Sequence, residues 1–185
     1  MNRTTTQQGY SFVEVLVAIA ILLIGLVGPL TIAATGLKNA TFAKEQNTAF
    51  FLAQEAIEGA IYLREQGGLQ NLANDAVDPW AWVDSLPNEC FTGTSGTPCR
   101  YNVSTRTFTV CDPVSECALN LHSTGVARYL HDAGGEATPF TRRVYFMEQN
   151  AFTLTVTVKV DWQSNTFGSD KELTLGTYVT NIYGN

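Results

Sequence analysis

Two hydrophobic patterns follow each other along the first third of the chain. The stretch from Val15 to Leu37 is mostly apolar and contains no charged residue. As a helix, these 23 residues would measure roughly 34 Å, which is enough to cross the apolar core of a bilayer. The sequence therefore predicts a membrane-spanning helix near the N-terminus.

After Gly36 the pattern becomes amphipathic. Apolar residues recur at three- and four-residue steps, and charged residues fall mostly elsewhere. The apolar positions are Phe42, Ala49, Ala53, Ala56, Ile57 and Ala60, and the charged ones are Lys44, Glu45, Glu55, Glu58 and Arg64. We expect this stripe to pack against the rest of the protein and the helix to stop at Gly67 and Gly68. Residues 10–66 would then form one long helix.

Three residues disturb the apolar run, namely Gly25, Gly28 and Pro29. Pro29 cannot donate a hydrogen bond to the carbonyl of Gly25, and its ring crowds that turn. We therefore expect a helix break at these positions. One interpretation is a proline that a membrane helix tolerates, and the other is a segment that melts locally when the helix packs in an assembly.

The second half of the chain favours β-strands. Apolar residues at 152, 154, 156, 158, 160 and 162 alternate strictly with polar ones, which indicates a half-buried antiparallel strand. Residues 140–146 predict a strand before it, and Leu173, Leu175 and Val179 mark its hairpin partner across a loop at 163–170. Tyr101 with Val103, and Phe108 with Val110, suggest two short strands, whereas residues 111–128 resemble a loop.

One short helical turn is predicted before these strands. Asp78 and Pro79 are suited to an N-cap and to the first helical position, just before Trp80 and Trp82, which we expect to be core residues. An amphipathic helix followed by a meander indicates an α+β fold with the helix on one face of an antiparallel sheet. The expected segments are a leader at 1–9, a membrane-spanning helix at 10–36, an amphipathic helix at 37–66 and a β-rich head at 67–185.

The charge is acidic overall, with a formal net charge of −6. This balance argues against general binding of nucleic acid. Arg100, Arg106, Arg142 and Arg143 could form a local basic patch, but solvated strand positions are the simpler interpretation of them.

The four cysteines, Cys90, Cys99, Cys111 and Cys117, lie within one stretch of 28 residues. An even, clustered set in an exported chain indicates two disulfides, for which three connectivities are possible. We favour Cys90–Cys99 with Cys111–Cys117, because each pair closes a short loop. The spacing lacks the close cysteine pair of most zinc sites, even with His122 and His131 nearby, and the loop at 165–170 is too poor in carboxylates for calcium, so no metal is expected.

Glu14 lies at the start of the apolar run, where a carboxylate costs roughly 2.5–3.5 kcal/mol on insertion scales. A plain membrane anchor has no need of it. Cleavage after Gly9 would give Tyr10 a free α-amino group, and the amine of a neighbouring subunit could then pair with Glu14. The uncleaved chain cannot form this pair, because the nitrogen of Tyr10 is then an amide.

The residues from Gly9 and Tyr10 through Glu14 to Ile19 resemble the class III signal of type IV pilins and type II secretion pseudopilins. This resemblance implies cleavage between Gly9 and Tyr10 by a prepilin peptidase, N-methylation of Tyr10, and a subunit-pairing role for Glu14. The family usually has Phe where this chain has Tyr10. The stretch from Ala53 to Glu58 is similar to minor pilins of the type IV pilus modification group and to the minor pseudopilin I of type II secretion.

Two other interpretations of the N-terminus are weaker. Residues 1–36 could be an ordinary secretory signal peptide with a cleavage site near Ala33 and Ala34, but its apolar region would be unusually long and would contain Glu14. An unrelated uncleaved anchor would not explain the junction at Gly9. The amino group and Arg3 predict a cytoplasmic N-terminus with the head outside.

No set of residues in the sequence indicates catalysis, since no nucleophile, base and orienting group are visible together. We therefore expect a subunit without cofactor, anchored in the bacterial cytoplasmic membrane and then incorporated into a pilus or pseudopilus. Its partners would be the prepilin peptidase and other pilin or pseudopilin subunits. The alternative is a binding module on the same anchor, either a pilus-tip adhesin or a DNA-uptake pilin.

Overall fold

The computed structural model describes residues 11–74, 89–90, 97–150, 152–164, 166 and 168–182. The leader at 1–9, the Gly9–Tyr10 junction and the predicted turn with Trp80 and Trp82 lie outside the described residues. The chain divides into two units, residues 1–43 and residues 44–185. Each unit is described by itself below, and we call the second one the head.

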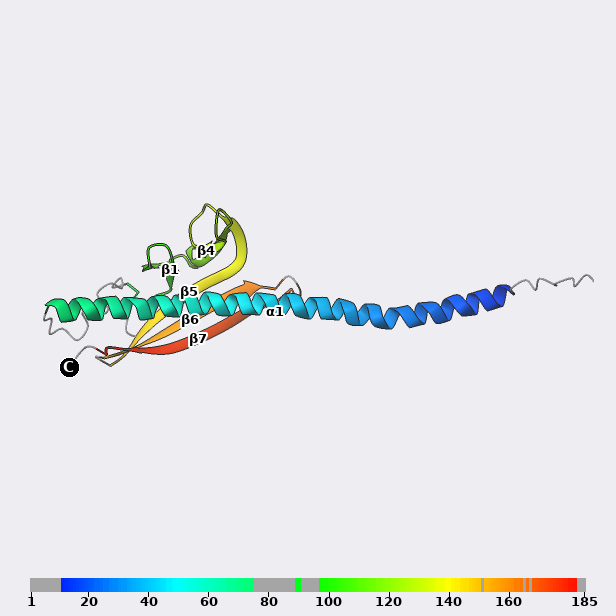
Figure 1. Ribbon diagram of the computed structural model, residues 1–185, viewed down its shortest axis with the longest axis horizontal. Coiled ribbons are helices and arrows are strands. Elements are labelled where there is room, and N and C mark those ends of the chain that lie inside the picture. Colours follow the sequence, from blue (N-terminus) through cyan, green and yellow to red (C-terminus); the bar gives the residue numbers. More distant parts are fainter. Residues whose placement is uncertain are drawn as a thin grey trace, which may run out of the picture. The chain divides into compact units, whose positions relative to one another are not determined.

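One helix, α1, takes up Phe12–Asn74 and contributes to both units (Figure 1). Its N-terminal part holds the apolar run, including Pro29 inside the helix. Four threonines on α1 donate their hydroxyl hydrogen to the carbonyl oxygen four residues earlier, at 2.8–3.0 Å; they are Thr31, Thr35, Thr41 and Thr48. These bonds satisfy the hydroxyl groups within the helix, so that threonine is compatible with an apolar environment.

The predicted end of this helix at residue 66 is wrong, because α1 continues through Gly67 and Gly68 to Asn74. A glycine in a helix costs only about 1 kcal/mol relative to alanine. Both glycines are buried. This burial offsets the intrinsic preference of glycine against helix, and a pattern along the sequence cannot show it.

The described strands of the head form one antiparallel sheet of seven. They are β1 (Cys99–Asn102), β2 (Thr107–Val110), β3 (Ala118–His122), β4 (Arg128–Leu130), β5 (Glu136–Asn150), β6 (Thr153–Gln163) and β7 (Asp170–Thr180). A short 3₁₀ helix at Val114–Cys117 precedes β3. The α+β class and the two short strands, β1 and β2, are as predicted, except that Val103 lies in the turn between them rather than in β1.

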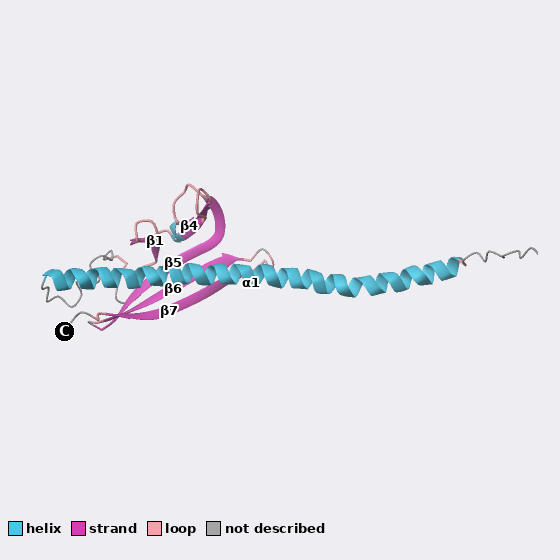
Figure 2. Ribbon diagram, in the orientation of Figure 1, coloured by secondary structure: helices cyan, strands magenta, loops and turns pink. Residues whose placement is uncertain are grey.

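The long strand β5 joins the parts of this sheet. One of its edges pairs with β6, from Phe140 opposite Trp162 to Asn150 opposite Thr153. Its other edge pairs with β1 through Val144 and with β3 through Thr141. The strands β5, β6 and β7 form the long antiparallel part of the sheet in Figure 2.

Within the head, α1 packs on one face of this sheet. Its buried side chains include Ala49, Ala53, Ala56 and Ala60, as the amphipathic pattern predicts. The alternation in β6 is also confirmed, since Leu154, Val156, Val158, Val160 and Trp162 are all at least 96% buried. Its predicted first member, Phe152, is wrong, because this residue precedes β6 and is exposed. The core of the head therefore lies between the sheet and a helix face that combines these alanines with Leu52, Ile57 and Leu63.

Two expectations about the head are wrong. The region 111–128, expected to be a loop, contains the 3₁₀ helix and β3, because pairing with β5 stabilises a strand whose own apolar pattern is short. Arg142 is not a solvated strand position but is completely buried. It lies on the same side of β5 as Phe140, Val144 and Phe146, which are buried too.

Candidate functional site

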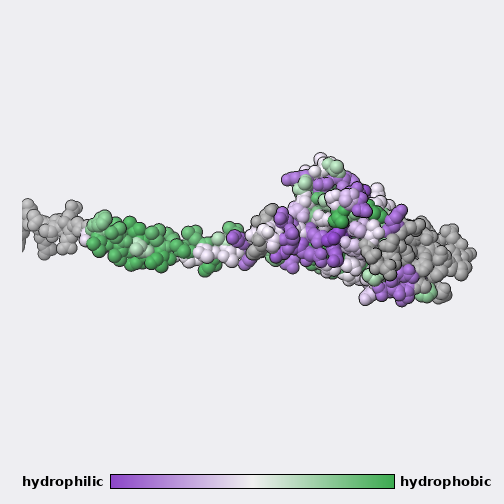
Figure 3. Space-filling view, turned by 180° about the vertical axis from the view of Figure 1, so that it is seen from behind, coloured by the Kyte–Doolittle hydropathy of each residue, from purple (hydrophilic) through white to green (hydrophobic). Residues whose placement is uncertain are grey.

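The N-terminal unit presents an almost continuous apolar surface. From Phe12 to Leu37, the large apolar side chains are 45–78% exposed. Figure 3 shows this surface as a hydrophobic segment of the helix, in contrast to the more polar head. The helix is long and apolar enough to cross a membrane. A surface of this kind requires lipid or other apolar helices around it, since exposing so much apolar surface to water is unfavourable.

Glu14 lies in the first turn of α1, with its side chain exposed. Backbone N–H groups at a helix start have no partner within the helix, and the helix dipole there favours a negative charge. Within the described part of the chain, no cation forms an ion pair with Glu14. The helix start therefore offsets part of the cost of the carboxylate and leaves it available to a partner.

The other predicted residues of this segment are distributed as follows. Gly9 and Tyr10 lie outside the described residues. Gly25 and Gly28 face open space, since a Cβ at either would meet nothing within 4 Å. Pro29 lies within α1, and the helix continues on both sides of it. The predicted helix break thus stays a prediction about the assembled state.

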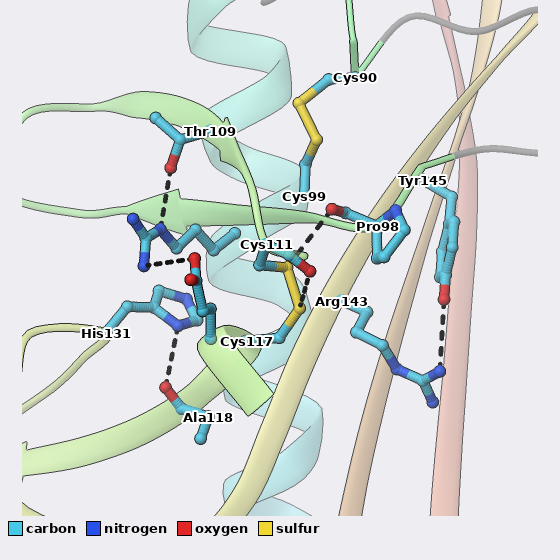
Figure 4. The surroundings of a disulfide bond; sticks show 12 residues. Cys90, Pro98, Cys99, Thr109, Cys111, Cys117, Ala118, His131, Arg143 and Tyr145 are labelled. Carbon is cyan, nitrogen blue, oxygen red and sulfur yellow. Dashed lines mark hydrogen bonds and ion pairs between the residues drawn. A yellow bond between two sulfur atoms is a disulfide. The ribbon is translucent and has the colours of Figure 1, made fainter. Parts of the chain in front are cut away.

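The cysteines pair as the sequence favours, Cys90 with Cys99 and Cys111 with Cys117 (Figure 4). All four are fully buried. Cys99 begins β1 and Cys111 follows β2, and the backbone N–H of Cys111 donates to the carbonyl of Pro98 at 3.0 Å. The two disulfides therefore fasten the open end of the β1–β2 hairpin to the segments on either side of it.

The two histidines have structural surroundings. Nδ1 of His131 lies 3.0 Å from the carbonyl oxygen of Ala118, and burial lowers the pKa of His131 to about 4. The ring of His122 packs against Gly135, and its Nε2 lies 3.3 Å from the carbonyl oxygen of Asp132. Among the described residues, no group of three His, Cys, Asp or Glu side chains is placed to hold a metal ion.

One residue pair of the head was missed from the sequence. The guanidinium of Arg142 forms an ion pair with Glu55 of α1, at 2.6 Å. The alternation of β5 carries a signal for the burial of Arg142, because it has the same parity as Phe140 and Val144. Nothing in the sequence pattern identifies Glu55 as its partner, since the two residues are 87 positions apart.

Comparison with protein families gives a match over residues 4–28. The chain carries the prokaryotic N-terminal methylation motif. This motif is the signature of type IV pilins and pseudopilins, and it includes the Gly9–Tyr10 junction and Glu14. Comparisons with curated proteins and with solved structures gave no match. The methylation motif and the exposed apolar helix together suggest a pilin-like precursor anchored in a membrane.

Proposed function

We propose that the chain is a minor subunit of a type IV pilus or of a type II secretion pseudopilus. A prepilin peptidase cleaves it between Gly9 and Tyr10, and Tyr10 is then N-methylated. The single observation that carries this proposal is the methylation motif on a helix whose apolar surface is unburied from Phe12 to Leu37. The role is structural, in starting or building the filament.

The order of events follows from the charge on Glu14. Before cleavage, the chain offers Glu14 no amine at position 10. Cleavage supplies the free amino group of Tyr10, and the pair between this amine and Glu14 of a neighbouring subunit then lowers the cost of both charges in an apolar environment. Processing and assembly are thereby coupled.

Mass spectrometry of the mature N-terminus tests the processing step. We expect a chain that begins with N-methyl-Tyr10 when the protein is purified from cells with a prepilin peptidase. In cells without the peptidase, the chain should still begin at Met1, with or without its formyl group. A mature start near Thr35 would instead identify an ordinary signal peptide and overturn the proposal.

The substitution Glu14→Ala tests the assembly step. The variant should enter the membrane and be cleaved normally, because neither step needs the carboxylate, but at least ten times less of it should be recovered in sheared filaments. The matched control is Glu58→Ala, which removes an exposed carboxylate from the head part of the same helix. Normal incorporation of Glu14→Ala would refute the pairing role.

Deletion of the chain separates assembly from binding. Loss of filaments or of their initiation supports the subunit role, whereas intact filaments with lost adhesion or DNA uptake would favour a binding module. Quantification of sheared filaments tests the minor role, since a minor subunit should be rare in them. If this chain were the most abundant filament protein, it would be the major subunit.

A further inference from the structure

Arg142 makes three hydrogen bonds inside the head, and its side chain is 0% exposed. Nη1 donates to Oε2 of Glu55 at 2.6 Å and to the carbonyl oxygen of Leu52 at 3.0 Å. Nη2 donates to the carbonyl oxygen of Tyr101 on β1 at 2.9 Å. One guanidinium thus links α1, β1 and its own strand β5, which is a use of the planar fork that lysine cannot reproduce.

The helix face around this link carries regularly spaced alanines beside the larger Leu52, Ile57 and Leu63, which are buried as well. Ala49, Ala53, Ala56 and Ala60 are buried at steps of four, three and four residues. A shift of the helix by seven residues would bring Ala49 to the place of Ala56, and Ala53 to the place of Ala60. These alanines alone therefore discriminate only weakly between the two positions, because a methyl group would stand at the same place in each.

The contacts of Arg142 do discriminate between these positions. After a shift by seven residues, Thr48 or Tyr62 would stand where Glu55 stands now. Neither residue supplies a carboxylate, so the buried guanidinium would lose its counter-charge. Leaving a buried charge without its partner is far more costly than exchanging one methyl contact for another.

Gly59 distinguishes the observed position in a second way. The ring of Tyr101 lies directly on Gly59, where a Cβ would overlap the ring atoms. The same shift would place Leu52 or Gln66 under this ring. Steric exclusion at Gly59 and charge pairing at Glu55 therefore select the same position of α1 on the sheet.

We propose that Arg142 is a positioning residue that sets the register of α1 on the sheet, and that Gly59 beneath Tyr101 is the second determinant of that register. This inference goes beyond the proposed function, since it concerns the head in any assembly.

Distances between two spin labels on the full-length protein in detergent micelles test the proposal. The chain has no free cysteine among its described residues, so cysteines introduced at the exposed positions Glu58 and Thr174 can be labelled selectively. In the parent protein we expect one narrow distance distribution between α1 and β7. In Arg142→Met, a second population should appear, displaced by up to about 10 Å, which corresponds to the two helical turns of a seven-residue shift.

The neighbouring Arg143→Met is the matched control. Arg143 follows Arg142 on β5 but pairs with Asp161, and its side chain is partly exposed. This variant should keep the single distance of the parent. A single unchanged distance in Arg142→Met as well would overturn the proposal.

A second variant covers the case in which Arg142→Met does not fold. Glu55→Gln keeps the size and an acceptor oxygen but removes the charge that faces Arg142. We expect it to fold and to show the displaced population at a smaller fraction, and Gly59→Ala should show the same heterogeneity through the overlap with Tyr101. If the folded Glu55→Gln variant keeps the single parent distance, the register does not depend on this pair and the proposal fails.

Discussion

His131 illustrates at the residue scale how burial changes a side chain. Its Nδ1–H donates to the carbonyl of Ala118, while burial, followed by the positive charge of Arg142, lowers its pKa to about 4. In the unfolded chain the pKa of histidine is about 6.5. Between these two values the unfolded state binds a proton that the folded state does not, so stability rises with pH in this window and falls as the pH is lowered.

We therefore predict that the free energy of unfolding decreases from pH 6.5 toward pH 4, by up to about 3 kcal/mol. Urea unfolding of the full-length protein in micelles, measured at half-unit steps of pH, provides the test. His131→Gln should flatten the profile between pH 6.5 and 5, where few carboxylates titrate. His122→Gln is the matched control and should retain the loss. An unchanged profile in His131→Gln would assign the pH dependence to other groups.

Residues near one another in sequence were predicted better than partners far apart. The motif around Glu14 is local, so the sequence alone identifies it. The pair of Arg142 and Glu55 could not, because a charged residue on each of two elements gives no information about which elements meet. Arg142 is buried because α1 packs against the face of β5 on which Arg142 lies.

At the scale of elements, long periodic segments were predictable and short ones were not. The alternation of β6 and the stripe of α1 each repeat several times, so their buried faces follow from the pattern. The strands β3 and β4 have only five and three residues, and pairing with neighbours rather than their own pattern defines them. The extension of α1 beyond Gly67 and Gly68 likewise depends on packing.

The β1–β2 hairpin depends on its two disulfides in a way that can be measured. Cys90–Cys99 and Cys111–Cys117 close loops with sequence separations of 9 and 6 residues, for which loop entropy gives about 2–3 kcal/mol each. We predict that replacing either pair by alanine lowers the free energy of unfolding by about this amount. The double replacement should also release Tyr101 from Gly59, because the hairpin that carries Tyr101 loses both of its covalent attachments.

Urea unfolding of the three variants, with proteolytic mapping under non-reducing conditions to verify the pairing, tests this prediction. The same measurements on the parent protein after reduction with dithiothreitol should match the double replacement. A parent protein that unfolds identically with and without reductant would show that the sheet holds the hairpin without disulfides.

The whole molecule combines two units that require different surroundings. Residues 12–37 need an apolar environment, whereas the buried side chains that α1 contributes to the described core of the head begin at Ala49. The boundary between the units falls at residues 43 and 44, later than the end of the apolar run. Charge and hydropathy locate the end of the apolar run, but only packing locates the start of the core.

This arrangement predicts that a chain that begins at Lys44 folds without detergent. It keeps the buried helix face, the pair of Glu55 with Arg142 and both disulfides, so it should unfold in one cooperative transition in urea and retain the near-ultraviolet circular dichroism of the full-length protein. A chain that begins at Leu63 is the control. It lacks Ala49 to Ala60 and Glu55, which leaves the apolar face of β6 uncovered and Arg142 without its counter-charge, so it should aggregate or lose the cooperative transition. If the chain from Leu63 folded as well as the chain from Lys44, the helix would be an appendage of the head rather than part of its core.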